Sequence, residues 1–222
     1  MRDATLVFDL DGTLVDTAPD LVAATNHVLA GIGLPGVSEQ KLRPLIGHGA
    51  RFMVDHAMGP DAAKLSENER KRLLDLFLDY YRRNIAVGSR PFEGTVAALE
   101  RFRGAGAKLA VCTNKNERLA RTLLDALGMS PLFSAVAGRD TFPVFKPHPD
   151  HLLGTIRLAG GDAARAVMVG DSRIDIATAK AAGVPVVAVT FGYTDTPVRE
   201  LSPERAIDHY DELEAAIIAL LG

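Results

Sequence analysis

Residues 6–16 read LVFDLDGTLVD, and this stretch decides the fold of the chain. Its apolar start has no helical spacing and is followed by an Asp-Gly turn signal, which predicts a buried strand that ends at Asp9. Alternation along an extended backbone places Asp9 and Asp11 on the same side. Ligands of open α/β sheets bind at the carboxyl ends of the strands, so the stretch also predicts a site. A strand that ends in an Asx-type turn accounts for the same residues without any function.

The composition is that of a globular protein with a sizeable core. The chain has 222 residues, of which 47% are hydrophobic, and this length allows one or two domains. The formal net charge of −3 draws the chain to neither nucleic acid nor an anionic membrane, so we expect no such partner. No apolar run has the length of a membrane span, and no signal peptide opens the chain, so we expect a cytoplasmic monomer or homodimer. The single cysteine, Cys112, excludes an internal disulfide framework.

The rest of the chain divides into two kinds of pattern. Residues 16–87 carry helical patterns, among them a short helix expected over residues 38–45, with no strong strand signal, which predicts an all-helical domain inserted after the first strand. Helices and strands then alternate, with strands expected at residues 108–113, 134–137, 166–169 and 184–189. This alternation implies right-handed crossovers and a parallel sheet covered on both faces. We therefore expect an α/β core formed by residues 1–15 and 88–222.

Polar residues of possible function also lie at the end of the strand expected at residues 108–113 and in a later loop. Thr113 and Asn114 come directly after a strand, where they either cap the next helix or cradle a phosphate, and both roles can hold together. Lys146 lies in the sequence FKPHP, residues 145–149. Two prolines set one residue apart exclude helix and central strand, so this segment is a rigid loop that fixes the direction of Lys146.

Two further carboxylates follow the strand at residues 166–169. Asp171 lies at the strand end, and Asp175 lies in the first turn of the next helix, where the helix dipole alone favours an acidic residue. Together with Asp9 and Asp11 they crowd negative charge onto one edge of the sheet, which is costly unless a cation neutralises it. Only hard oxygen ligands are present, so Mg²⁺ is the expected ion.

These segments, in this order, resemble the phosphatases of the haloacid dehalogenase superfamily. The resemblance implies a Rossmann-like three-layer core with a parallel sheet and an inserted all-helical (C1-type) cap, here residues 16–87. Four shorter segments are similar to bacterial phosphoglycolate phosphatases. They are LIGHGAR at 45–51, AVCTNK at 110–115, VGDS at 169–172 and FGY at 191–193.

The resemblance implies a role for each acidic residue. Asp9 is the expected nucleophile and forms an aspartyl-phosphate, while Asp11 gives a proton to the leaving group and later takes one from water. Mg²⁺ is expected on the Asp9 carboxylate, the Asp11 backbone carbonyl and Asp171. Asp175 is expected to steady Lys146 or a water bound to the metal.

The same resemblance implies how phosphate and substrate are held. Thr113, Asn114 and Lys146 are the expected phosphate-binding residues, and Thr113 and Lys146 also count as catalytic because they stabilise the phosphoryl oxygens. In the cap, three residues are expected to hold the carboxylate of a small phosphorylated acid, although a plain turn between helices explains them equally well. These residues are Gly47, His48 and Arg51.

The expected reaction is the Mg²⁺-dependent hydrolysis of 2-phosphoglycolate to glycolate and phosphate. The alternatives on the same fold are a sugar phosphomutase similar to β-phosphoglucomutase and another small-molecule phosphatase or pyrophosphatase. A non-catalytic binding protein is the alternative from another class. The intact set of polar residues at the strand ends argues against it.

Overall fold

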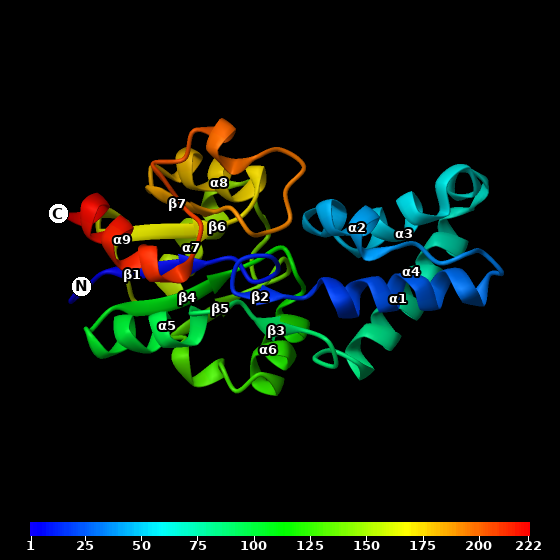
Figure 1. Cartoon of the computed structure of the whole chain (residues 1–222), viewed down its shortest axis with the longest axis horizontal. Helices are drawn as coiled ribbons and strands as arrows, with labels where there is room; N and C mark the ends of the chain where they lie inside the picture. The colour runs from blue at the N-terminus through cyan, green and yellow to red at the C-terminus, as the bar shows by residue number, and fades with distance from the viewer.

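A six-stranded parallel sheet forms the centre of the larger part of the molecule in the computed structural model, which describes residues 1–222 (Figure 1). The strand order is β5-β4-β1-β6-β7-β8, and every neighbouring pair is parallel. The strands are β1 (Thr5–Phe8), β4 (Lys108–Cys112), β5 (Ala135–Ala137), β6 (Ala166–Gly170), β7 (Val186–Val189) and β8 (Arg205–Ile207). The strand that opens the chain therefore lies inside the sheet, between β4 and β6.

Helices cover both faces of this sheet, so the predicted α/β fold with three layers is confirmed. The helices of this part are α5 (Thr95–Gly104), α6 (Glu117–Ala126), α7 (Pro149–Leu158), α8 (Arg173–Ala182) and α9 (Leu213–Leu221). Leu6 and Phe8 of β1 face the apolar cluster formed with α5, α6 and α9. Val7 faces the second cluster, formed with α7 and α8. Successive side chains of one strand thus pack into two different apolar cores, which is why the run is apolar on both sides.

The sequence patterns missed one strand of this sheet and one small pairing. β8 has only three residues and begins at the exposed Arg205, so it carries no apolar run. The short strands β2 (Val15–Asp16) and β3 (Arg90–Pro91) pair antiparallel where the chain leaves and re-enters the sheet region. Two-residue strands have no periodicity, and only the tertiary pairing reveals them.

The segment between β2 and β3 is a group of helices beside the sheet (Figure 1). Its α-helices are α1 (Ala18–Gly31), α2 (Glu39–Leu42), α3 (Ala50–Met58) and α4 (Glu67–Arg83). Ser66 and Glu69 start α4 with a capping box. The helix expected from residue 38 to 45 is wrong in its second half. There a 3₁₀ helix runs from Arg43 to His48, because Pro44 has no amide hydrogen to continue the α-helical pattern.

Short 3₁₀ helices complete the connections. They are Arg43–His48, Gly59–Lys64, Ser130–Leu132, Ala163–Arg165, Val198–Leu201 and Tyr210–Glu212. No helix of the structure combines the length and the apolar composition that crossing a bilayer requires.

A buried carboxylate joins the two connections between the helical group and the sheet. Asp20, in the first turn of α1, is 5% exposed. Its oxygens accept hydrogen bonds from Gly88 N at 2.8 Å, from Ser89 N at 2.8 Å and from Ser89 Oγ at 2.6 Å. The outgoing and the returning chain are therefore tied together by one side chain. The domain boundaries at residues 15/16 and 87/88 stay a prediction.

We expect Asp20→Ala to lower the free energy of unfolding by roughly 2–4 kcal/mol, because it leaves the two buried donors of Ser89 and the half-buried amide of Gly88 without an acceptor. Urea unfolding measures the change. Asp75→Ala, at an exposed position of α4, is the matched control and is expected to change stability by less than about 0.5 kcal/mol. Equal values for the two variants contradict the role given to Asp20.

Candidate active site

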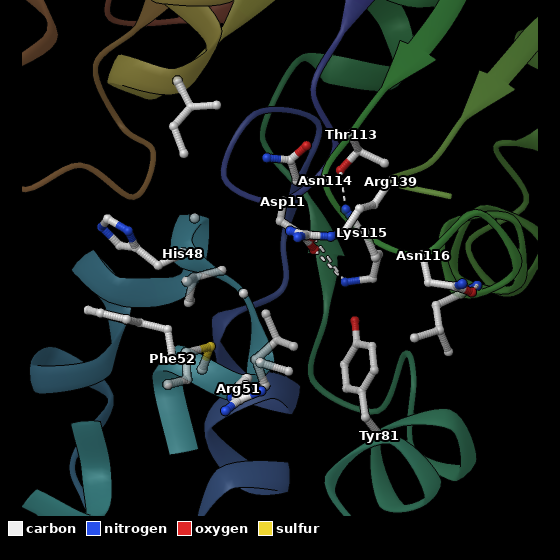
Figure 2. Close-up of a pocket in the computed structure, with 18 of the residues that line it drawn as sticks. Asp11, His48, Arg51, Phe52, Tyr81, Thr113, Asn114, Lys115, Asn116 and Arg139 are labelled. Carbon is white, nitrogen blue, oxygen red and sulfur yellow. Dashed lines mark hydrogen bonds and ion pairs between the residues drawn. The ribbon is translucent and has the colours of Figure 1, made fainter. Parts of the chain in front are cut away.

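The candidate site lies at the carboxyl ends of three neighbouring strands. Asp9 follows β1, Thr113 follows β4 and Asp171 follows β6. A cavity of about 610 Å³ opens there and is lined by these residues and by residues of the helical group (Figure 2). The sheet therefore brings together side chains that are far apart in the sequence, at the edge where ligands of such sheets bind.

A buried lysine joins two of the predicted carboxylates. Lys146 is 2% exposed, and its Nζ lies 3.0 Å from Asp9 Oδ1 and 2.6 Å from Asp175 Oδ1. Burial opposes the charge of Lys146, but Asp175 and Asp9 outweigh it and raise the pKa of the lysine above its usual value. Burial also raises the pKa of Asp9 to about 6, although Lys146 acts in the opposite direction. Both ends of this pair are thus desolvated, and each is needed to compensate the other.

The rigid loop predicted around Lys146 is held by a buried histidine. His151 Nδ1 accepts a hydrogen bond from Lys146 N at 3.1 Å, and His151 Nε2 lies 3.1 Å from the carbonyl oxygen of Gly138. A carbonyl only accepts, so Nε2 carries the proton and the ring is neutral. Burial and then Lys146 lower the pKa of His151 to about 4. The ring therefore supports the loop, and its nitrogens are not free to bind a metal together with His148.

Asp171 is surrounded by donors and by glycine. Thr13 Oγ1 donates to Asp171 Oδ1 at 2.7 Å, and Tyr193 N donates to Asp171 Oδ2 at 2.6 Å. A Cβ atom at Gly12 or Gly192 would overlap the Asp171 side chain, so neither position has room for another residue. Burial, together with the nearby carboxylates, raises the pKa of Asp171 to about 8. No lysine or arginine side chain forms an ion pair with it.

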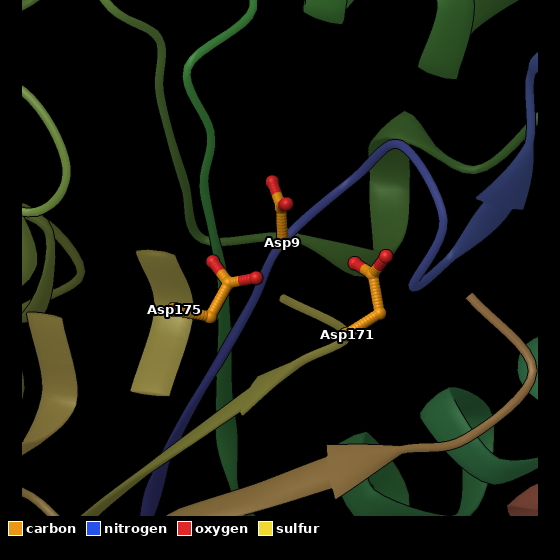
Figure 3. A group of neighbouring side chains, drawn as sticks. All are labelled: Asp9, Asp171 and Asp175. Carbon is orange, nitrogen blue, oxygen red and sulfur yellow. The ribbon is translucent and has the colours of Figure 1, made fainter. Parts of the chain in front are cut away.

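The geometry and charge of this cluster fit a divalent cation. One oxygen each from Asp9, Asp171 and Asp175 lie within 4.8 Å of one another (Figure 3). Asp175 is already used, because it binds Lys146 and also accepts hydrogen bonds from Ser172 N at 3.1 Å and Ser172 Oγ at 2.6 Å. Asp9 and Asp171 are the carboxylates that remain for an ion. A cation there would neutralise the charge of Asp171, which no lysine or arginine of the protein pairs with, and would share Asp9 with Lys146.

The side chain of Asp11 points to a different partner. Its oxygens accept from Lys115 Nζ at 2.8 and 3.0 Å, and the same ammonium lies 4.7 Å from the ring centre of Tyr81 on α4 (Figure 2). Neither Lys115 nor Tyr81 was predicted from the sequence to belong to the site. The available signal is that Lys115 directly follows Thr113 and Asn114 at a strand end. Nothing in the sequence joins it to Tyr81.

The two polar residues after β4 have separate contacts. Thr113 Oγ1 accepts from Lys115 N at 3.2 Å. Asn114 Nδ2 donates to the carbonyl oxygen of Lys146 at 2.9 Å, and its Oδ1 is buried without a hydrogen-bond partner. Capping of the next helix by these residues is wrong, because Asn116 is the residue that caps α6. Thr113 and Asn114 are therefore free of that structural task and face the cavity.

The three residues predicted in the helical group all line the cavity. Gly47 and His48 lie in the 3₁₀ helix before α3, and the exposed His48 ring lies 4.7 Å from the Phe52 ring. Arg51 is exposed and binds Glu67 with both terminal nitrogens, at 2.7 and 2.8 Å. Its guanidinium is therefore already paired with an acid of α4.

One tyrosine joins the helical group to the acidic cluster. Asp16 accepts a hydrogen bond from Tyr193 Oη at 2.5 Å and forms an ion pair of 2.6 Å with Arg43, which precedes the cavity-lining turn. The Arg43 guanidinium also lies 5.0 Å from the centre of the Tyr193 ring. The backbone N–H of Tyr193 holds Asp171, so one residue serves both ends of the site.

The neutral state of His151 predicts a dependence of stability on pH. Its pKa falls from 6.5 to about 4 on folding, so between these values the unfolded chain takes up a proton that the native protein does not. The contribution is complete above pH 6.5 and is lost as the pH falls to about 4, by roughly 3 kcal/mol in all. We expect His151→Gln to flatten the pH dependence of urea unfolding, and His56→Gln, at an exposed site, to leave it unchanged.

Comparison with known proteins places the chain in a family. The model of the haloacid dehalogenase-like hydrolases matches residues 6–189. A protein named phosphoglycolate phosphatase from Mesorhizobium japonicum is 55% identical over 94% of this chain and 92% of its own length. One of the same name from Agrobacterium fabrum is 46% identical over 97% of this chain and 92% of its own.

A solved structure agrees with these sequence matches. The crystal structure of a predicted phosphoglycolate phosphatase from Haemophilus somnus superposes with a TM-score of 0.89 and 33% identity, covering 97% of this chain and 98% of that one. The family resemblance seen in the opening stretch is thereby confirmed. The family match and the similar relatives show that this protein belongs to the haloacid dehalogenase-like hydrolase family, and the parallel sheet and the acidic cluster of the structure agree with this.

Proposed function

We propose that the protein is a Mg²⁺-dependent phosphatase that hydrolyses 2-phosphoglycolate to glycolate and phosphate. Relatives that are 44% to 55% identical carry the name phosphoglycolate phosphatase, and this supports the substrate. The observation that carries the reaction type is the contact of 3.0 Å between Lys146 Nζ and Asp9 Oδ1 at the end of the central strand. It sets a buried carboxylate beside a fixed cation, which suits attack on an anionic phosphate.

In the first step Asp9 attacks phosphorus, and the bond to the glycolate oxygen breaks. The product is a phosphoryl group on the Asp9 carboxylate. The slow hydrolysis of the phosphate ester is thereby split into two easier steps. Lys146 and the Thr113 hydroxyl stabilise the phosphoryl oxygens as charge shifts onto them. Asp9, Asp171 and the backbone carbonyl of Asp11 would hold Mg²⁺, which would supply positive charge where an anionic nucleophile approaches an anionic ester.

Asp11 handles the protons of both steps. It is two residues from Asp9 and faces the same cavity. It gives a proton to the departing glycolate oxygen, because an alkoxide is a poor leaving group. In the second step it takes a proton from the water that attacks the phosphorylated Asp9, and the enzyme returns to its starting state.

Residues 16–87 act as a cap that excludes water and takes part in selecting the substrate, because the cavity is lined by residues of this segment as well as by residues of the core. Gly47, His48 and Arg51 are candidates for that selection. We also propose that the protein works in the cytoplasm, as a monomer or a homodimer, without nucleic acid or membrane as a partner. The test of the whole proposal is phosphate release from 2-phosphoglycolate, measured beside sugar phosphates and nucleotides, with isomer formation followed for the sugars.

For the proton role, we expect Asp11→Asn to lower kcat for 2-phosphoglycolate by at least about 100-fold. With p-nitrophenyl phosphate, whose leaving group needs no proton, the first step is expected to survive as a burst of nitrophenolate in rapid-mixing kinetics. Circular dichroism is expected to match wild type. A variant that hydrolyses 2-phosphoglycolate at the wild-type rate rules out this role for Asp11.

For the metal, we expect EDTA to abolish turnover and Mg²⁺ to restore it. If Mg²⁺ binds the native protein and not the unfolded chain, the free energy of unfolding is expected to rise by about 2.7 kcal/mol when the Mg²⁺ concentration is 100 times its dissociation constant. Thermal unfolding with and without Mg²⁺ measures this gain. It is expected to disappear in Asp171→Ala and to persist in Asp75→Ala. A wild-type protein with full turnover in EDTA contradicts the assignment.

A further inference from the structure

Four cationic side chains line the cavity, and each of them has a partner within the protein. Those four are Lys115, Lys146, Arg51 and Arg139. Lys146 is held between two carboxylates and Arg51 by Glu67, as described above. The guanidinium of Arg139 lies 3.7 Å from the centre of the Phe145 ring at the surface. Lys115 differs from the other three because its carboxylate partner is Asp11, the residue proposed to carry protons to and from the leaving group.

Lys115 is buried between the core and the helical group. Its side chain is 6% exposed, and its Nζ contacts only the carboxylate of Asp11 and the face of the Tyr81 ring. An ammonium has three donors, so a single carboxylate does not exhaust it. Burial opposes the positive charge, yet Asp11 keeps the pKa of Lys115 above its usual value, so the group is a cation.

Tyr81 gives a second and independent sign of a ligand. The residue is 1% exposed, and its hydroxyl oxygen faces the Lys115 ammonium, but no acceptor lies within hydrogen-bond distance of the hydroxyl proton. Figure 2 shows this hydroxyl directed toward the Lys115 ammonium, inside the cavity. A buried hydroxyl without a partner costs free energy, and native proteins seldom leave one in that state. An acceptor placed beside Lys115 would satisfy it.

The proposed substrate carries such an acceptor at the right place. In 2-phosphoglycolate a single methylene separates the bridging ester oxygen from the carboxylate. Asp11 serves the bridging oxygen, and Lys115 lies 2.8 Å from Asp11. A cation beside the residue that protonates the leaving oxygen is therefore within reach of the acid group attached to it.

We propose that Lys115 and Tyr81 bind the carboxylate of the substrate and thereby select a phosphorylated acid. The Lys115 ammonium is shared between Asp11 and the substrate, and the Tyr81 hydroxyl donates a hydrogen bond to the same carboxylate. This inference rests on the proposed hydrolysis of 2-phosphoglycolate. It assigns selection to one residue of the core and one of α4, in place of the exposed His48 and the paired Arg51.

Burial strengthens this assignment on physical grounds. A charge pair is stronger in a water-poor cavity than at an exposed side chain, where solvent screens it. A substrate without the carboxylate would lose the charge pair with Lys115 and would offer the Tyr81 hydroxyl a weaker, uncharged acceptor, and sites built to bond a group discriminate against analogues that lack it. Contact from both sides of the cavity would also hold the helical group over the bound substrate.

The test compares 2-phosphoglycolate with 2-hydroxyethyl phosphate, which has a hydroxymethyl group in place of the carboxylate. The quantity measured is the ratio of the two kcat/KM values. We expect wild type to favour the acid, Lys115→Met to reduce this preference by about 10- to 100-fold, and Tyr81→Phe by about 10-fold. Lys115→Arg is expected to keep part of the preference. Lys71→Met, which removes an exposed lysine of α4, is the matched control and is expected to keep all of it.

The outcomes separate this inference from the proposed function. If wild type favours the acid and Lys115→Met retains that preference, or loses activity equally on both substrates, Lys115 acts through Asp11 alone and the inference is wrong. If wild type hydrolyses 2-hydroxyethyl phosphate but not 2-phosphoglycolate, the proposed substrate is wrong and the inference falls with it. Tyr81→Phe keeps the aromatic ring, so it decides the question even where Lys115→Met does not fold.

Discussion

Two buried lysines balance the negative charge that gathers at the carboxyl end of the sheet. Lys146 forms ion pairs with Asp9 and Asp175, and Lys115 forms an ion pair with Asp11. Each carboxylate would be expensive to bury alone, so each lysine is as much a condition of the folded state as a tool for chemistry. The parallel sheet makes this possible, because neighbouring strands end at one edge and deliver residues from distant segments to one place. The fold and the site are in this sense one arrangement.

Asp9 and Asp11 are side chains of the same type, and this arrangement gives them different surroundings. They are two residues apart, yet Lys146 reaches Asp9 from a loop fixed by His151, whereas Lys115 reaches Asp11 from the end of β4 beside Tyr81. Burial raises the pKa of Asp9 to about 6, and a cation on its second side would oppose that effect. Differences in surroundings of this kind would let one type of residue fill the two roles proposed here, nucleophile for Asp9 and proton carrier for Asp11.

The sequence predicted what depends on local pattern and missed what depends on tertiary contact. The apolar run before Asp9 predicted a buried strand, and the alternation after residue 90 predicted the covered parallel sheet. The edge strand β8 has no apolar run, and Pro44 turned part of an expected helix into a 3₁₀ helix. Lys115 and Tyr81 were not predicted as site residues for another reason. A loop lysine is usually solvated and a tyrosine in an amphipathic helix usually fills a core, and only the folded chain brings them together.

Tyr193 has a consequence for how the two parts of the molecule influence each other. Its hydroxyl binds Asp16, which also holds Arg43 of the helical group, while its amide binds Asp171 of the acidic cluster. A chain of contacts therefore runs from Arg43 and Asp16 through Tyr193 to Asp171. If an ion binds at Asp171 as proposed, it would favour one position of Tyr193 and with it one placement of the helical group, and by reciprocity that placement would favour the ion.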